Sequence, residues 1–147
     1  MWAPARRPVG IVADMSPGPW QTRYGGPPRL LLVVAPGFLL MRMREAVRSI
    51  PGVELAGGFG NAEDALDWAV WNRHAWHVAY VDMTLPGHAG ERLAARLCAS
   101  PRAGVVVGLT AHLWEEERAR LRPFGVSEIL EKGDHAAFRD HVESALR

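Results

Sequence analysis

Three side chains that could together handle a phosphoryl group stand at the ends of apolar runs. Asp82 follows the run 78–81, Thr110 follows the run 105–109, and Lys132, the only lysine in the chain, follows the run 126–131. A carboxylate can attack phosphorus and become an acyl phosphate. An ammonium can neutralise phosphoryl oxygens, and a hydroxyl can donate a hydrogen bond to one. If the three runs are neighbouring strands, one pocket would hold an acid, a hydroxyl and an amine.

The rest of the pattern supplies the elements that would position these residues. Five apolar runs, each the length of a buried strand, alternate with five segments of helical periodicity. Strands are expected at 30–34, 53–57, 78–82, 105–109 and 126–131, and helices at 38–50, 61–73, 90–99, 113–122 and from Asp134 onward. Such alternation predicts an α/β fold, a parallel sheet with helices on both faces. Ligands bind such sheets at the carboxyl ends of the strands, where the three residues would lie.

Two of these helices have apolar faces clear enough to predict their buried residues. In the helix at 38–50, the inward positions are Leu39, Met43, Val47 and Ile50. In the last helix, the inward positions are Phe138, His141, Val142 and Ala145. The charged segment 115–122 is instead expected to be a solvated helix face, with its glutamates paired to Arg118 and Arg120 at helical spacing.

The first 28 residues differ from everything that follows. They are rich in proline and glycine and carry no apolar period, so we expect a disordered tail at 1–28 and one domain at 29–147. Met15 is an alternative start, which would leave residues 1–14 untranslated. Because the sequence ends after the fifth helix, no effector domain is expected to follow.

Composition narrows the classes of function. The formal net charge is +1, which favours neither nucleic acid nor an acidic membrane as a partner. The lone cysteine, Cys98, fits a reducing compartment and a small core position on a helix. No signal-peptide pattern opens the chain, and the apolar run 30–41 is too short to span a bilayer. We therefore expect a cytoplasmic protein.

The three residues lie in motifs that resemble the receiver domain of two-component response regulators. The segment 82–90 reads Asp-x-x-x-Pro-x-x-x-Gly, 109–111 reads Leu-Thr-Ala, and Lys132 ends the fifth strand. The segments 125–127 and 129–132 are most similar to the subfamily whose members usually carry a helix-turn-helix output. The resemblance covers about residues 29–147. It implies a flavodoxin-like, doubly wound sheet of strand order 2-1-3-4-5 and a signalling domain rather than an enzyme.

The resemblance also assigns roles. Asp82 would be the phosphoacceptor, Thr110 the switch hydroxyl and Lys132 the phosphate-binding lysine. The flanking positions, where the family varies the lifetime of its phosphoryl group, are Thr84, Ala111 and His112. The partners implied are a histidine kinase, a phosphotransfer protein or another signalling protein, with a homodimer left open.

Two departures from the family pattern bear on the chemistry. The paired acids that normally hold Mg²⁺ at the first strand end are replaced by Ala35 and Pro36. Mg²⁺ requires oxygen ligands in near-octahedral geometry, so Asp82 alone would be a weak metal site. The aromatic residue usually found three positions before the lysine is Ile129. These departures favour a pseudo-receiver that binds partners without phosphorylation, and the alternative is a receiver that accepts phosphate on Asp82.

Other interpretations of the sequence compete with the receiver resemblance. Gly58-Phe59-Gly60, followed by Glu63, imitates a dinucleotide-binding loop, but Glu63 would face a pyrophosphate, so a small nucleotide-binding enzyme is the lesser alternative. His74 and His77 lack further ligands at metal-binding spacing. The three tryptophans near the end of the second helix would either pack under a loop or form a contact patch; they are Trp68, Trp71 and Trp76.

Overall fold

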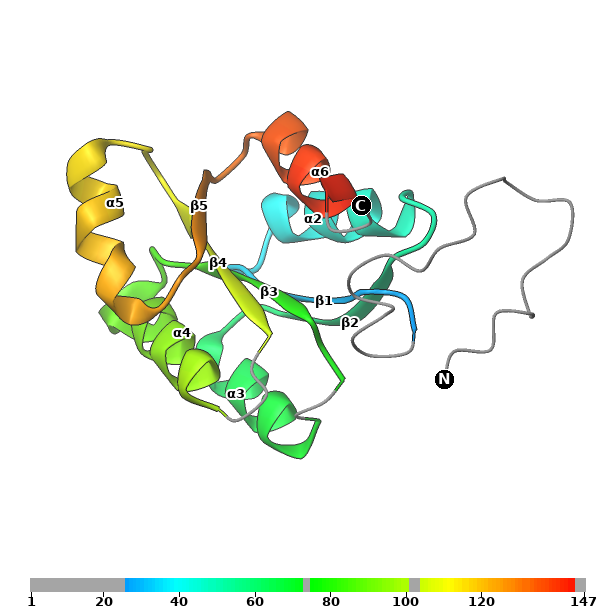
Figure 1. Ribbon diagram of the computed structural model, residues 1–147, viewed down its shortest axis with the longest axis horizontal. Helices are drawn as coiled ribbons and strands as arrows, with labels where there is room; N and C mark the ends of the chain where they lie inside the picture. The colour runs from blue at the N-terminus through cyan, green and yellow to red at the C-terminus, as the bar shows by residue number, and fades with distance from the viewer. Residues whose placement is uncertain (1–25, 73–74, 101–103, 145–147) are drawn as a thin grey trace, which may run out of the picture.

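The computed structural model describes residues 26–72, 75–100 and 104–144. A five-stranded parallel sheet of order β2-β1-β3-β4-β5 forms its centre (Figure 1). The strands are β1 (Arg29–Val33), β2 (Glu54–Phe59), β3 (Val78–Asp82), β4 (Val105–Thr110) and β5 (Glu128–Glu131). The helices are α2 (Phe38–Arg48), α3 (Ala62–Trp71), α4 (Ala89–Ala99), α5 (Glu115–Leu121) and α6 (His135–Ser144). The predicted flavodoxin-like, doubly wound architecture is confirmed.

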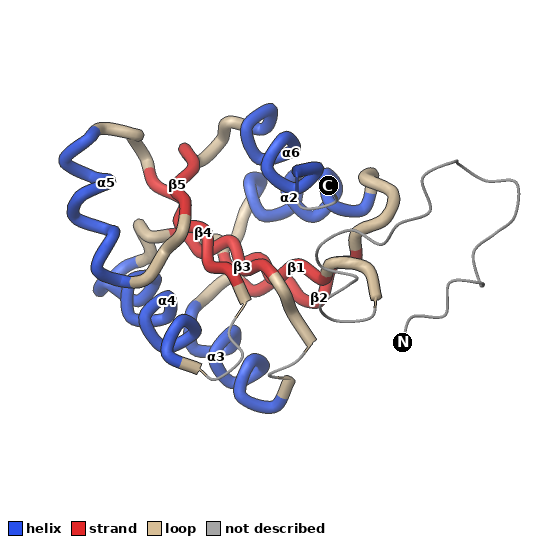
Figure 2. Tube along the Cα trace, in the orientation of Figure 1, coloured by secondary structure: helices blue, strands red, loops and turns tan. Residues whose placement is uncertain are grey.

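Helices cover both faces of this sheet. In Figure 2, α2 and α6 lie on one side, whereas α3 and α4 lie on the other and α5 sits beyond β5. Each side has its own apolar core. Strand residues alternate between them: Leu30 and Leu32 pack with Met43 of α2 and Phe138 of α6. Leu31 and Val33 face the opposite way, toward α3 and α4.

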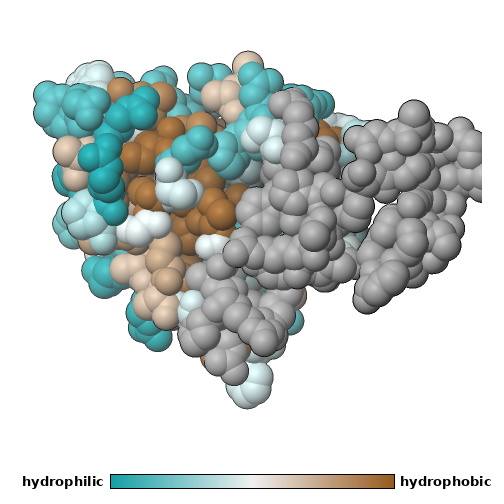
Figure 3. Space-filling view, viewed as in Figure 1, coloured by the Kyte–Doolittle hydropathy of each residue, from teal (hydrophilic) through white to brown (hydrophobic). Residues whose placement is uncertain are grey.

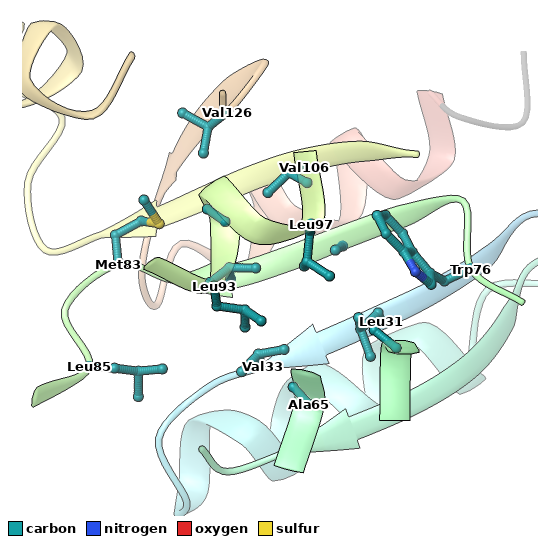
Figure 4. Packing of buried hydrophobic residues seen from close by; sticks show 14 of the residues in the cluster. Leu31, Val33, Ala65, Trp76, Met83, Leu85, Leu93, Leu97, Val106 and Val126 are labelled. Atoms are coloured by element: carbon teal, nitrogen blue, oxygen red, sulfur yellow. The ribbon is translucent and has the colours of Figure 1, made fainter. Parts of the chain in front are cut away.

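The core beneath α3 and α4 is shown in Figure 4, where Leu31 and Val33 of β1 point toward Ala65, Leu93 and Leu97. Val78, Ala79, Tyr80, Val81 and Asp82 are all buried, as expected for a central strand covered on both faces. Strand β3 pairs with β1 on one edge and β4 on the other, and this pairing fixes the position of Asp82 at its end.

The element boundaries agree with the sequence expectations to within a few residues, and the strand at 78–82 agrees at both ends. Met43, Val47 and Ile50 are buried as expected, and Leu39 is half-buried against the same core. Leu40, which the sequence pattern did not single out, is buried as well. Gly37, the N-cap residue of this helix, has φ 142°, a conformation that favours glycine.

Most of the expected tail lies outside the described residues, at 1–25. Of its last residues, Pro28 is buried, and its carbonyl accepts a hydrogen bond of 2.9 Å from the backbone N–H of Glu54. Ala145, assigned to the inner face of the last helix, is also outside the described part. No helix within the described residues has the length and apolar character needed to cross a membrane.

Candidate functional site

Asp82 is completely buried, and both of its carboxylate oxygens have partners. The backbone N–H of Thr84 donates to Oδ1 at 2.9 Å, and the Thr84 hydroxyl donates to the same oxygen at 2.6 Å. The Lys132 ammonium lies 3.0 Å from Oδ2, and the backbone N–H of Ala35 donates to Oδ2 over a longer 3.4 Å. Lys132 also donates to the Thr84 hydroxyl at 2.9 Å. Asp82, Thr84 and Lys132 therefore form a closed triangle.

These contacts fix the charge state of the carboxyl group. Burial opposes ionisation of Asp82, but the hydrogen bonds from Thr84 and Lys132, with the positive charge of Lys132, lower its pKa below the usual value. Asp82 is thus an anion at neutral pH, and Lys132 compensates its charge directly. The predicted pairing of Asp82 with Lys132 is present, and Thr84 proves to be a direct partner rather than a flanking residue.

A close backbone approach holds this triangle in place. Gly90 stands at the start of α4, and a Cβ atom there would lie 2.1 Å from the carbonyl oxygen of Asp82. Only glycine allows the helix to come this near to the strand end. The motif glycine therefore packs α4 against the loop that carries Thr84, and this explains its spacing from Asp82 on physical grounds.

The Thr110 hydroxyl is directed elsewhere. It is buried, and it donates a 2.9 Å hydrogen bond to the Glu117 carboxylate on α5, not to Asp82. The hydrogen bonds from Arg120, acting against burial and together with the bond from Thr110, lower the pKa of Glu117. The expectation of one pocket holding acid, amine and hydroxyl is therefore met for Asp82 and Lys132, while Thr110 engages a different acid. Ala111 and His112 follow it as exposed residues, with His112 stacked on Trp114.

Glu117 belongs to an ionic network that the sequence did not reveal. Arg120 bonds Glu117 at 3.0 and 2.9 Å and also contacts the carboxylate of Glu91 on α4. Glu91 is only 3% exposed, and its other oxygen lies 2.6 Å from His88 Nδ1. Burial alone would raise the pKa of Glu91, but Arg120 and His88 outweigh burial and lower it. The network links the switch-position threonine to the loop that follows Asp82.

The charged face at 115–122 thus differs from the expectation in one respect. The pairing of Glu117 with Arg120 at helical spacing is confirmed. The face is not merely solvated, because Arg120 reaches across to α4. Residues 91 and 120 are far apart in sequence, so only the packing of two helices could bring them together.

The Mg²⁺ ion that the resemblance implies does not fit the residues present. Ala35 contributes a backbone N–H, which is a donor and repels a cation, and Pro36 contributes no carboxylate. The Lys132 ammonium already lies against Oδ2 of Asp82. Among the described residues, no three acidic, histidine or cysteine side chains gather as a metal site would require.

The structure also bears on two less favoured interpretations, a nucleotide-binding loop at 58–60 and a metal site at His74 and His77. The expected nucleotide loop is filled, because the Arg44 guanidinium donates to the Gly58 carbonyl at 2.7 Å and occupies the space beside its Cα. His77 is buried, and its Nδ1 accepts from the backbone N–H of Arg29 at 2.9 Å. Its suggested companion His74 lies outside the described residues.

Three other side chains can now be placed. Cys98 is half-buried on α4, with its thiol against the Gly125 carbonyl, and burial raises the pKa of that thiol. His141, expected to face inward, bonds the buried Tyr80 hydroxyl at 2.8 Å and lies 2.9 Å from the Glu128 carboxylate. Ile129 packs partly against the core at the position where receivers usually have an aromatic residue.

Comparison with known proteins places these features in a family context. No protein-family model matches the chain. The response regulator UvrY of Escherichia coli is 29% identical over 105 residues, which are 71% of this chain and 46% of UvrY. The chain therefore spans about half the length of the curated relatives it matches.

Solved structures of receiver domains share the fold of this chain. The response regulator domain of Thermotoga maritima CheB has a TM-score of 0.69 at 14% identity, covering 81% of this chain and 96% of that one. The receiver domain of the putative response regulator NarL from Mycobacterium tuberculosis has a TM-score of 0.68 at 19% identity, covering 82% and 93%.

The fold is that of a response-regulator receiver domain, and the resemblance noted in the sequence is confirmed. The similar structures include receivers of the LuxR and NarL types, in agreement with the predicted likeness to the helix-turn-helix output subfamily. Receiver domains are in general signalling domains rather than enzymes.

Proposed function

We propose that this chain is an atypical receiver domain, a pseudo-receiver, that signals through protein contacts without phosphorylation of Asp82. The observation that carries the proposal is the state of the Asp82 carboxylate. Both oxygens are buried and accept hydrogen bonds from Thr84, Lys132 and Ala35. A nucleophilic carboxylate needs a free lone pair and an open approach for the phosphorus atom. In this structure, freeing a lone pair and opening an approach would both require breaking the hydrogen bonds among Asp82, Thr84 and Lys132.

The missing metal ligands support the same proposal. Phosphoryl transfer depends on positive charge placed against the transferring group. Ala35 and Pro36 cannot hold a divalent cation beside Asp82, which leaves Lys132 as the cation in contact with that carboxylate. Lys132 would then serve the folded domain by neutralising Asp82, in place of binding a phosphoryl group.

The surface that transmits the signal would be the one formed by α5, β5 and α6, which receivers commonly use. In the space-filling view, hydrophobic residues gather between α5 and α6, over β5 (Figure 3). Ile129 and Leu130 of β5 are half-buried there, and Trp114 is 62% exposed at the start of α5. Exposed aromatic and aliphatic residues with charged neighbours are typical of protein contact sites. The partner would be a histidine kinase, a phosphotransfer protein or another signalling protein.

Thr110 would couple this surface to the acid site only weakly. Its hydroxyl is held by Glu117 on α5, and no phosphoryl group draws it toward Asp82. Ile129 offers no aromatic ring to move inward. A ligand shifts a conformational equilibrium only through a difference in affinity for the two states. Without a phosphoryl group at Asp82, that difference is absent.

The test is a binding titration with a partner isolated by co-purification on the full chain. Wild type and Asp82→Asn should bind this partner with equal affinity, with or without acetyl phosphate, while Trp114→Ala should weaken binding to both. The alternative function, a receiver switched by phosphate on Asp82, predicts a different result. Under that alternative, the donor raises the affinity of wild type and has no effect on Asp82→Asn.

A further inference from the structure

A groove on the side of the sheet opposite α2 and α6 has no role in the proposed function. It runs between α3 and α4 and consists of two adjoining hollows of about 670 and 620 Å³. Leu66 and Arg96 line both hollows, so the groove is continuous. Its apolar lining includes Ala69, Trp76 and Leu97.

Two large apolar side chains stand exposed beside this groove. Trp71 is 86% exposed at the end of α3, and Val70 is also exposed, although both line the first hollow. The three tryptophans near the end of α3 therefore differ in burial. Trp76 is buried and Trp68 is half-buried against Phe59, whereas Trp71 projects outward. An exposed tryptophan next to an apolar hollow is the usual arrangement of an interface anchor.

The banks of the groove carry opposite charges. On α3, Glu63 and Asp67 are exposed one helical turn apart, and on α4, Arg92 and Arg96 are exposed at the same spacing. Among the described residues, the side chains of Glu63, Asp67 and Arg96 take part in no hydrogen bond or ion pair. Arg92 donates only to the Gly87 carbonyl. One acidic helix and one basic helix thus flank the same apolar strip, with their charges unpaired.

We infer that this face binds a second copy of the chain, in a twofold dimer that places α3 of each copy against α4 of the other. A twofold interface must be complementary to itself. This face is, because the acidic bank of one copy would meet the basic bank of the other on both sides of the axis. Trp71 and Val70 of each copy would enter the apolar groove of its partner. The face is distinct from the α5–β5–α6 surface, so the dimer leaves that surface free.

Sedimentation velocity of the full chain, from low micromolar to near-millimolar concentration, tests the inference. Wild type should show a monomer–dimer equilibrium. Trp71→Ala should weaken the dimer at least about tenfold, the effect expected when a central aromatic anchor is truncated. Trp114→Ala, at an exposed tryptophan on the other face, is the matched control and should leave the dimer unchanged.

Charge reversal provides the second arm. Arg96→Glu should weaken the dimer by placing two acidic helices together, and Glu63→Arg combined with Arg96→Glu should restore it. Arg118→Glu, at an exposed arginine on α5, should have no effect. Circular dichroism confirms folding, and all of these side chains are exposed.

Three results would overturn the inference. They are a wild-type monomer at every concentration, a dimer insensitive to Trp71→Ala and Arg96→Glu, and a failure of the double reversal to restore the dimer. A monomer whose binding to a different protein depends on Trp71 would assign the face to that protein instead. None of these results depends on whether Asp82 is phosphorylated.

Discussion

At the scale of single residues, Thr84 is more than a neighbour of Asp82 in the sequence, because it bonds both charged groups of the site. Its hydroxyl donates to Asp82 and accepts from Lys132, so it joins the two charges of the site. Hydrogen bonds to buried charged groups contribute more to stability than neutral ones, and a charge left without its partner costs more again. Much of the stability of this end of the sheet should therefore depend on one hydroxyl.

We expect Thr84→Val to lower the free energy of unfolding by about 2 kcal/mol, because it keeps the shape but removes a hydrogen bond to a buried carboxylate. Thr84→Ser keeps the hydroxyl and is the matched control, with an expected loss well below that. Urea unfolding followed by fluorescence measures both. Equal losses in the two variants would mean that the methyl group, not the hydroxyl, is what matters.

The stability of the domain should also fall with acid in a way that depends on Asp82. The folded state lowers the pKa of this carboxyl, so its contribution is fully present above the unfolded value, about 3.9, and is lost as pH falls through the lower folded value. Unfolding free energies measured from pH 6 downward, in wild type and Asp82→Asn, isolate this contribution. Glu91 and Glu117 also have lowered pKa values and act in the same range, so the difference between the two proteins is the quantity to follow. An identical pH dependence in both would contradict the assignment.

Restoring the acidic pair should restore metal binding. Wild type should show no saturable response to Mg²⁺ at low millimolar concentration, whereas Ala35→Asp with Pro36→Asp should bind measurably, because carboxylates are the ligands that Mg²⁺ requires. Backbone NMR shifts around Asp82 report the binding. Tight, saturable binding by wild type would show that Ala35 and Pro36 are no obstacle.

At the scale of elements, α5 is fastened at two points. Thr110 of β4 bonds Glu117, and Arg120 joins Glu117 to the buried Glu91 of α4. Two side chains of α5 thus connect it to the strand end and to the helix that follows Asp82. A short helix of seven residues has little stability of its own, so these contacts should decide its position.

Arg120→Ala should therefore destabilise the domain by about 2 kcal/mol, below the loss seen for fully buried pairs because Arg120 is half exposed. It leaves the Glu91 carboxylate buried with His88 as its remaining partner. Arg118→Ala, at an exposed arginine of the same helix, should change the unfolding free energy by less than about 0.5 kcal/mol. Thermal or urea unfolding of the two variants makes the comparison, and similar losses would refute a special role for Arg120.

These elements also show what the sequence could and could not predict. Apolar runs and helical periodicity located all ten main elements, because burial and backbone geometry impose those patterns directly. The pairing of Asp82 with Lys132 followed from parallel strand ends meeting at one edge. The direction of the Thr110 hydroxyl did not follow, since a threonine rotamer depends on which acceptor the next helix brings near. The contact of Arg120 with Glu91 likewise depends on the distance between two helices.

At the scale of the whole molecule, the domain has two surfaces with different chemistry, one at the β5 edge of its sheet and one over α3 and α4 (Figure 2). The α5–β5–α6 surface adjoins the acid site through Thr110 and Glu117. The α3–α4 groove carries the unpaired charges and Trp71. We therefore expect partner binding and self-association to be separable by mutation: Trp114→Ala should affect the first alone, and Trp71→Ala the second alone.

The most direct test of the account is the intact mass of the protein after incubation with acetyl phosphate and Mg²⁺. Wild type should remain unmodified, because the Asp82 carboxylate is buried, fully bonded and without a metal site. A receiver with an intact acidic pair, treated in parallel, controls for the donor, and Ala35→Asp with Pro36→Asp shows whether the lost acids are the cause. We expect no phosphoryl addition to wild type. A single phosphoryl group gained by wild type and absent from Asp82→Asn would contradict the proposal of a pseudo-receiver and support a receiver switched by phosphate on Asp82.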